Sequence, residues 1–134
     1  MIINWKNSIL KVAGIYNIVW GTLVIIFPNA FFELAGMELP LYPMIWQCVG
    51  MIVGVYGLGY WIASNDPNRH WPIVVVGLLG KIFGPIGFAY YATIGMFPIK
   101  WGLIIILNDV IWWLPFGLIL YSAYKTYSEN LTLA

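Results

Sequence analysis

The chain has 134 residues, of which 62% are hydrophobic and only 8% are charged, and its formal net charge is +1. Soluble domains carry about 25% charged residues, so a soluble fold would leave this chain with too few polar side chains to cover its surface. The length fits a single domain covering residues 1–134. A near-neutral charge without any Lys- or Arg-rich stretch argues against nucleic acid as a partner.

Four apolar segments are each long enough to cross a bilayer as a helix, which takes about 20 residues. They cover approximately residues 9–27, 43–63, 72–95 and 102–124. After the first segment, Phe31, Phe32 and Ala35 are spaced to share one face of a short helix at the membrane interface. The sequence therefore predicts an all-α fold, an integral membrane bundle of four antiparallel transmembrane helices.

Four crossings put both termini on one side of the membrane, and that side is the more positively charged. It carries Lys6, Lys11, Arg69 and Lys125, whereas the opposite side carries Lys100, Glu33 and Glu38. Cytoplasmic loops of membrane proteins have an excess of Lys and Arg. We therefore expect an integral protein of the cytoplasmic (inner) membrane, with its N- and C-termini in the cytoplasm.

Glycines recur at a spacing typical of close helix packing in membranes. They are Gly50 and Gly54 in the second segment and Gly77, Gly80 and Gly84 in the third. Small residues four apart let helix backbones approach each other where lipid supplies little hydrophobic drive. We predict that these glycines pack helices, within the chain or in a homo-oligomer. A second interpretation is that they leave room for a cavity, because Gly77 and Gly84 share a helical face with Lys81.

Charged and polar side chains lie inside the predicted spans, where a charge costs about 2.5–3.5 kcal/mol on insertion scales. They are Lys81, Asp109, Asn108, Asn17, Tyr56 and Gln47. Helical rise places Asn17, Tyr56 and Lys81 in one layer near the midplane, and places Asn108 and Asp109 about 10 Å from the outer edge. These residues either specify the helix arrangement or form a site or pathway for a proton, an ion or a polar-headed ligand.

An ion pair between Lys81 and Asp109 is the most direct way to accommodate two charges inside the membrane. The third and fourth segments are neighbours, but helical rise separates the two residues by about 7–10 Å in depth. Direct contact requires a helix break at Gly84 and Pro85 or a tilted helix; otherwise a water or Asn108 bridges the two charges. Pro85 has no N–H, so we also expect it to kink its helix and free a backbone carbonyl.

The turn between the second and third segments holds Asp66, Arg69 and His70. We predict that these three residues form the inner mouth of the pathway or contact a lipid headgroup. The single histidine and the single cysteine, Cys48, are too few for a metal site or a disulfide. No catalytic set of residues is recognisable, so we predict neither catalytic residues nor a cofactor. The aromatic fraction of 18% suits a bound lipid or another apolar ligand.

Three stretches of the chain resemble a group of short bacterial membrane proteins with four spans. The stretches are YPMIWQCVGMIVGVYG (42–57), DPNRHWPIVVVGLLGKIFGPIG (66–87) and NDVIWWLPF (108–116). The group is broadly DoxX-like in size and span number, and its biochemical function is not established. Some members carry an alkyl hydroperoxide reductase name, but such chemistry needs an activated cysteine and usually a second one, and Cys48 stands alone. The resemblance implies the four-span fold and no catalytic residue.

Two classes of function follow from these observations. One is a small transporter, channel or binder of a small or apolar ligand, with a polar site at mid-depth in the membrane. The other is a structural or accessory subunit that associates with membrane lipids and with another membrane protein. A membrane enzyme of redox or lipid chemistry is a third and weaker interpretation, because no catalytic constellation supports it.

Overall fold

The computed structural model describes residues 4–132, with side chains described for residues 4–129. These residues form helices and connecting turns, and the described part contains no β-strand. The long helices are α1 (Trp5–Ile26), α3 (Pro43–Ala63), α4 (Trp71–Thr93) and α6 (Trp113–Thr132). Two short helices complete the fold, namely α2 (Ala30–Ala35) and α5 (Gly102–Asn108). The predicted all-α class is confirmed.

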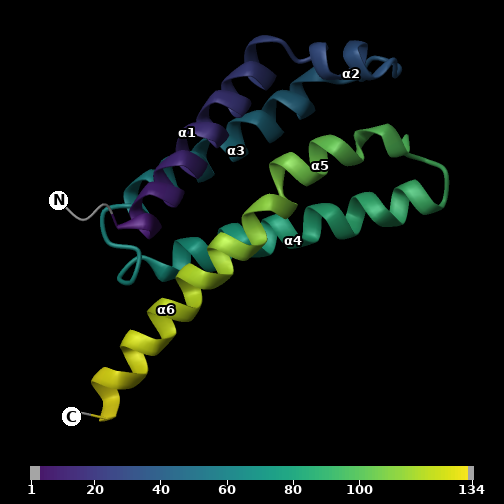
Figure 1. Cartoon of the computed structure of the whole chain (residues 1–134). Helices are drawn as coiled ribbons and strands as arrows, with labels where there is room; N and C mark the ends of the chain where they lie inside the picture. The colour runs from purple at the N-terminus through teal and green to yellow at the C-terminus, as the bar shows by residue number, and fades with distance from the viewer. Residues whose placement is uncertain (1–3, 133–134) are drawn as a thin grey trace.

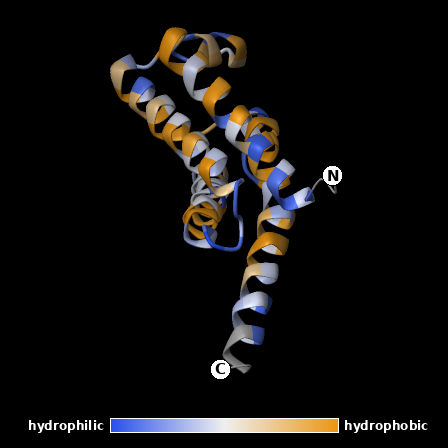
Figure 2. Cartoon of the chain, turned by 90° about the vertical axis from the view of Figure 1, so that its left-hand side faces the viewer, coloured by the Kyte–Doolittle hydropathy of each residue, from blue (hydrophilic) through white to orange (hydrophobic). Residues whose placement is uncertain are grey.

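Four helical segments of the described chain are long and apolar enough to cross a membrane. They cover Trp5–Ile26, Pro43–Ala63, Trp71–Thr93 and Ile99–Glu129. Each contains most of the corresponding segment expected from the sequence. Figure 2 shows hydrophobic residues along most of the helical surface, whereas hydrophilic residues gather near the N-terminus, in the turns and toward the C-terminal end. The chain therefore has the fold of a membrane-spanning four-helix bundle.

The first two spans form a tight hairpin whose backbones touch at glycines. A Cβ atom added at Gly57 would lie 2.7 Å from the carbonyl oxygen of Gly14, and one added at Gly50 would lie 2.9 Å from the carbonyl oxygen of Gly21. Real Cβ atoms do not approach other atoms so closely. Gly50 therefore packs against helix α1 of the same chain.

The fourth span is interrupted in its middle, unlike the other three. It begins with the 3₁₀ turn η1 (Ile99–Trp101), continues as α5, breaks at Asp109 and passes through the 3₁₀ turn η2 (Val110–Trp112) into α6. Asp109 has φ −123° and ψ −59°, which lies outside the α-helical region. By contrast, α4 continues through Pro85 without interruption. The helix break at Gly84 and Pro85, one of the two routes to direct contact considered from the sequence, is therefore not present, and the break lies in the facing span instead.

The two hairpins, α1–α3 and α4–α5, diverge away from a shared core. Figure 1 shows them parting toward the end that carries α2 and the α4–α5 connection. Helix α5 makes almost no contact with α1 or α3. The fully buried core lies toward the other end, where both chain ends are drawn. It is formed by Leu10, Ala13, Tyr60, Ala63, Val74, Trp112, Phe116 and Ile119.

A polar cluster closes the end of the bundle that holds the N-terminus and the 64–70 turn. The Nζ atom of Lys6 donates hydrogen bonds to the Oδ1 atom of Asn68 at 3.2 Å and to the Oγ atom of Ser122 at 2.6 Å. Asn68 in turn donates to the hydroxyl oxygen of Thr126. These bonds connect α1, the turn and α6, so three segments distant in the sequence are joined at this end.

Candidate functional site

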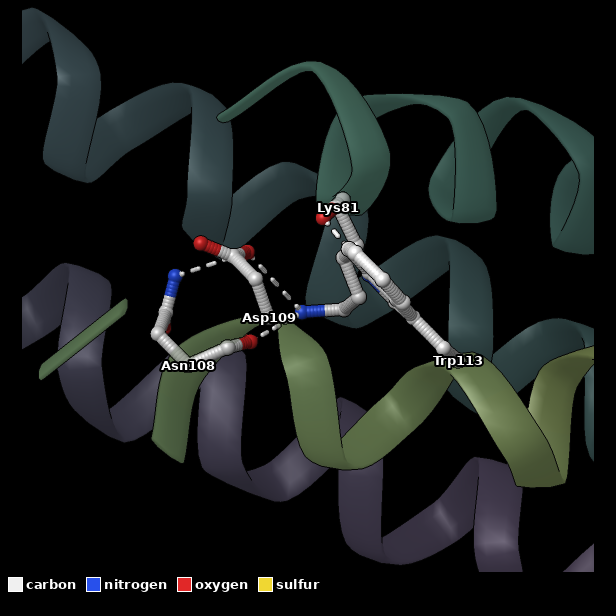
Figure 3. Close-up of polar contacts among 4 residues, drawn as sticks. All are labelled: Lys81, Asn108, Asp109 and Trp113. Carbon is white, nitrogen blue, oxygen red and sulfur yellow. Dashed lines mark hydrogen bonds and ion pairs between the residues drawn. The ribbon is translucent and has the colours of Figure 1, made fainter. Parts of the chain in front are cut away.

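Lys81 and Asp109 lie together in the interior of the bundle. The Nζ atom of Lys81 is 3.9 Å from the Oδ1 atom of Asp109, and only 5% and 8% of the two residues are exposed. Direct contact, one of the alternatives that the sequence left open, is therefore present as an ion pair. Asn108 is also part of it, because its backbone carbonyl accepts a hydrogen bond from the Lys81 ammonium at 2.7 Å (Figure 3).

The helix bounds explain why the depth estimated from the sequence kept these two residues apart. Helix α4 ends at Thr93, twelve residues after Lys81, and the fourth span begins at Ile99, ten residues before Asp109. A rise of ~1.5 Å per residue then puts them about 18 Å and 15 Å from the end of the hairpin where α4 connects to the fourth span. The 3₁₀ turn at Ile99–Trp101 was not expected, and it carries Asp109 deeper by about one turn.

Helix α4 and the fourth span each have one backbone carbonyl without a hydrogen bond inside its own helix. A side chain of the facing span donates a hydrogen bond to that carbonyl. Pro85 has no N–H, so it cannot donate to the carbonyl of Lys81 four residues earlier; the indole N–H of Trp113 donates there instead, at 2.8 Å. Across the break, the N–H of Trp112 donates to the Asp109 carbonyl, which leaves the Asn108 carbonyl for Lys81. Figure 3 shows these crossed bonds, which we call the carbonyl brace. The expectation that Pro85 frees a carbonyl fits this geometry.

Further contacts hold both charges in place. The ring of Trp112 lies 5.7 Å from the Lys81 ammonium, within the range of a cation–π interaction. The side-chain amide of Asn108 donates to the Oδ1 atom of Asp109 at 3.2 Å. A Cβ atom at Gly84 would lie 3.3 Å from the Oδ2 atom of Asp109, so Gly84 makes room for this carboxylate. The lysine and the carboxylate compensate each other, and the pair carries no net charge.

The charged pair borders a cavity of about 300 Å³ that we call the polar cavity. Its polar lining consists of Asn17, Tyr56, Tyr60, Lys81, Asn108 and Asp109. Its remaining walls are Ile52, Val53, Gly77 and Gly80. Five of the six polar residues singled out inside the spans thus surround one space. The sixth, Gln47, lies elsewhere and donates from its side chain to the backbone carbonyl of Ile25.

Two residues of the polar cavity have unused capacity: Asn17 has an unpaired side-chain oxygen, and Gly80 has free space beside it. Asn17 is 4% exposed, and its Oδ1 atom has no hydrogen-bond partner among the described residues. Buried polar atoms are almost always paired with protein or solvent, so an unpaired oxygen on a residue that lines the cavity favours a hydrogen-bonding occupant there. A Cβ atom added at Gly80 would meet no atom within 4 Å. Gly80 therefore borders space rather than packing against a helix.

A second space, of about 280 Å³, lies between the diverging hairpins. Six aromatic side chains line it, from both hairpins: Trp20, Trp46, Phe88, Tyr91, Phe97 and Trp101. Ile104, Ile105 and Asn108 complete the lining, and we call this space the aromatic chamber. Trp46 and Trp101 both lie near span ends, and Trp101 is only 5% exposed. The indole nitrogens of both residues are buried and have no partner among the described residues.

The remaining predicted residues lie away from the two spaces. Asp66 accepts a hydrogen bond from the backbone N–H of Arg69 in the turn before α4, and both residues are exposed. His70 is the residue that precedes α4. On all four spans the buried core lies between this turn and the polar cavity, so the turn does not border the cavity. Among the described residues, no three His, Cys, Asp or Glu side chains gather closely enough to hold a metal ion.

Gly54 and Gly77 differ in what their missing side chains would meet. A Cβ atom at Gly77 would collide with the ring of Tyr60, whereas one at Gly54 would meet no atom within 4 Å. The Gly54 backbone nevertheless lies under Gly21, because a Cβ atom at Gly21 would come within 2.9 Å of the Gly54 nitrogen. Sequence reasoning missed Gly21, and it also missed Trp113, whose hydrogen bond depends on which helices meet.

Comparisons with protein-family models, curated proteins and solved structures find no significant match to the chain. The resemblance to DoxX-like proteins therefore stays a prediction. The two spaces and the side chains that line them are the features of the chain that bear on its function.

Proposed function

We propose that the protein is a membrane-embedded binding protein that takes a small molecule bearing a polar group into the polar cavity. The main support is the polar cavity itself, where a buried amide oxygen of Asn17 without a partner borders the same space as Lys81 and Asp109. A cavity that combines apolar walls with a few convergent polar groups is typical of small-molecule sites.

A binding site fits the arrangement better than an open channel does. Leu10, Tyr60 and Phe116 are at most 1% exposed and belong to the hydrophobic core. This core closes the bundle between the cavity and the end that holds the termini. On the opposite side the hairpins diverge around the aromatic chamber. A ligand would therefore enter and leave on the side that carries α2.

The orientation in the membrane belongs to the same proposal. We place the chain in a bacterial inner membrane with the N-terminus, the 64–70 turn and the C-terminus in the cytoplasm. The positive residues Lys6, Lys11, Arg69 and Lys125 support this orientation, because cytoplasmic segments are enriched in Lys and Arg. In this orientation the cavity opens toward the outer half of the membrane. Surrounding lipids, and a homo-oligomer or another membrane protein, are the partners that we propose.

Filling the cavity tests the proposed function directly. The variant Gly80→Leu adds a side chain where a Cβ atom meets no neighbour, so the bundle is expected to fold with the cavity occupied. Gly87→Leu is the matched control, because Gly87 lies on the same helix, a Cβ atom there also meets nothing, and it does not line the cavity.

The measurement is native mass spectrometry of the three proteins released from lipid nanodiscs, with extraction of the small molecules that they retain. We expect the wild type and Gly87→Leu to retain a bound species that Gly80→Leu has lost. Equal retention by all three proteins, or retention by none, would contradict the proposal. Retention by none would favour the alternative of a structural or accessory subunit.

A further inference from the structure

The aromatic chamber lies directly outward of the polar cavity on every span. Along α1, Trp20 of the chamber follows Asn17 of the cavity by about one turn, and along α4, Phe88 follows Lys81 by about two turns. On α3, which runs in the opposite direction, Trp46 precedes Val53 by about two turns. Asn108 lines both spaces. One elongated ligand can therefore occupy both.

The charges around the cavity decide which head group it accepts. Lys81 and Asp109 are 3.9 Å apart and are the only charged side chains that line the cavity among the described residues, so the lining has no net charge. An anionic or cationic head would add an uncompensated charge inside the membrane, which is costly. A neutral head with a hydrogen-bonding oxygen or hydroxyl carries no such cost, and Asn17 and Lys81 are available to bind it.

The residues that line the chamber indicate the polarity of the ligand body that fits there. Trp46 packs edge-to-face against Trp20, with ring centroids 5.8 Å apart, and Phe97 packs in the same way against Phe88 and Trp101 at 5.8 and 5.6 Å. These rings offer a large apolar surface with a few polar N–H edges. The buried indole N–H groups of Trp46 and Trp101 have no partner among the described residues. The ring surface matches an apolar body, and an acceptor atom on that body would satisfy the two indole N–H groups.

We propose that the ligand is a neutral amphiphile whose apolar body lies in the aromatic chamber and whose hydroxyl or carbonyl head reaches the polar cavity. This inference rests on the proposed function and adds the class of ligand to it. The two spaces together measure about 580 Å³, from 300 and 280 Å³, which is within the range of sites for drug-sized ligands.

Three probes that share one chain separate the possible head groups. They are dodecanol, dodecanoate and dodecylammonium, each with a photoreactive diazirine in the chain, added to the protein in nanodiscs. The measurement is saturable labelling followed by intact mass and peptide mapping. We expect half-saturation by the alcohol at a concentration about tenfold lower, or more, than by either ion, with labels on chamber residues. Preferred labelling by dodecanoate or dodecylammonium would overturn the neutral-head proposal.

A matched pair of variants on α5 tests whether the body lies in the chamber. Ile105→Trp fills the chamber, which Ile105 lines, whereas Ile106→Trp adds the same side chain at a position that is 49% exposed and outside the lining. We expect Ile105→Trp to raise half-saturation by dodecanol about tenfold and Ile106→Trp to leave it unchanged.

The two proposals fail in different ways. If Gly80→Leu loses the retained species but Ile105→Trp has no effect on dodecanol, the ligand binds in the cavity alone and the amphiphile proposal is wrong. If Gly80→Leu changes neither retention nor labelling, the proposed function itself is wrong. The control is the thermal unfolding temperature of Gly80→Leu and Ile105→Trp. If it equals that of the wild type, a loss of binding is not due to a loss of folding.

Discussion

Lys81 receives compensation from three different groups, and this makes a buried lysine tolerable in the membrane. Its ammonium contacts the Asn108 carbonyl at 2.7 Å, the Asp109 carboxylate at 3.9 Å and the face of Trp112 at 5.7 Å. Removing one partner of a buried pair leaves the other charge uncompensated, which costs more than removing both.

The variant Lys81→Met is therefore expected to lower the free energy of unfolding by about 3 kcal/mol. In the double variant Lys81→Met/Asp109→Asn no charge remains, so the loss should be at least about 1 kcal/mol smaller than the sum of the two single losses. Unfolding in mixed micelles by titration with sodium dodecyl sulfate measures all three variants. Additive losses would show that the two residues do not interact.

The hydrogen bond from Trp113 to the Lys81 carbonyl substitutes for the donor that Pro85 lacks. Trp113→Phe removes this donor, and we expect a loss of about 1 kcal/mol. Pro85→Ala restores the N–H within α4, so Trp113→Phe should cost less than about 0.5 kcal/mol in that background. The same unfolding titration checks the cycle, and an equal cost in both backgrounds would contradict the carbonyl brace.

At the scale of elements, the hairpin of α1 and α3 is the most closely packed part of the chain, and glycines set its spacing. The backbones meet at two levels, where Gly57 faces Gly14 and Gly50 faces Gly21. Close approach of this kind replaces the hydrophobic drive that lipid does not supply. This hairpin therefore forms a rigid wall for both the polar cavity and the aromatic chamber.

Two glycines on α3 allow a direct test of this packing. A Cβ atom at Gly57 would lie 2.7 Å from the Gly14 carbonyl oxygen, so Gly57→Ala should lower the free energy of unfolding by about 1–3 kcal/mol. Gly54→Ala, one turn away, meets open space and should change it by less than about 0.5 kcal/mol. Equal effects at the two positions would show that the backbones are farther apart.

The fourth span combines two functions in one element because it is broken. Helix α5 carries chamber residues, α6 carries core residues such as Phe116 and Ile119, and Asp109 lies between them outside helical geometry. Non-helical backbone at membrane depth persists only where protein or a cavity covers it. Here Lys81 binds the carbonyl that the break exposes, so the break and the charged pair stabilise each other.

At the scale of the whole molecule, a polar cluster closes one end of the bundle, and the two hairpins diverge at the other end. Lys6 joins α1 to Asn68 and Ser122 at the closed end, where Figure 2 also shows hydrophilic residues. The open end carries α2 and the aromatic chamber. This asymmetry agrees with entry of a ligand from a single side.

Reporter fusions test the proposed orientation. A fluorescent protein fused after residue 134 should fluoresce, because it folds in the cytoplasm, and alkaline phosphatase at the same position should be inactive. Phosphatase inserted after Glu38, in the connection between α2 and α3, should be active. The reverse pattern would show that the positive residues at the closed end do not determine the topology.

The sequence by itself determined the four spans and the short α2 helix, and it assigned one level to Asn17, Tyr56 and Lys81, which line the same cavity. These features depend on segment length, apolar composition and a constant rise per residue, which are local properties. It also marked Lys81 and Asp109 as exceptional, because charges inside an apolar segment are costly wherever the segment packs.

Only the tertiary structure decided that the break lies at Asp109 rather than Pro85, that Trp113 replaces the missing donor, and that Gln47 lies apart from the cavity. A carbonyl without a partner in its own helix accepts a hydrogen bond from a donor that the facing helix places beside it. The space between the hairpins in turn depends on how the two hairpins diverge. Both depend on how helices far apart in the sequence meet, and the composition of a single segment does not encode that meeting.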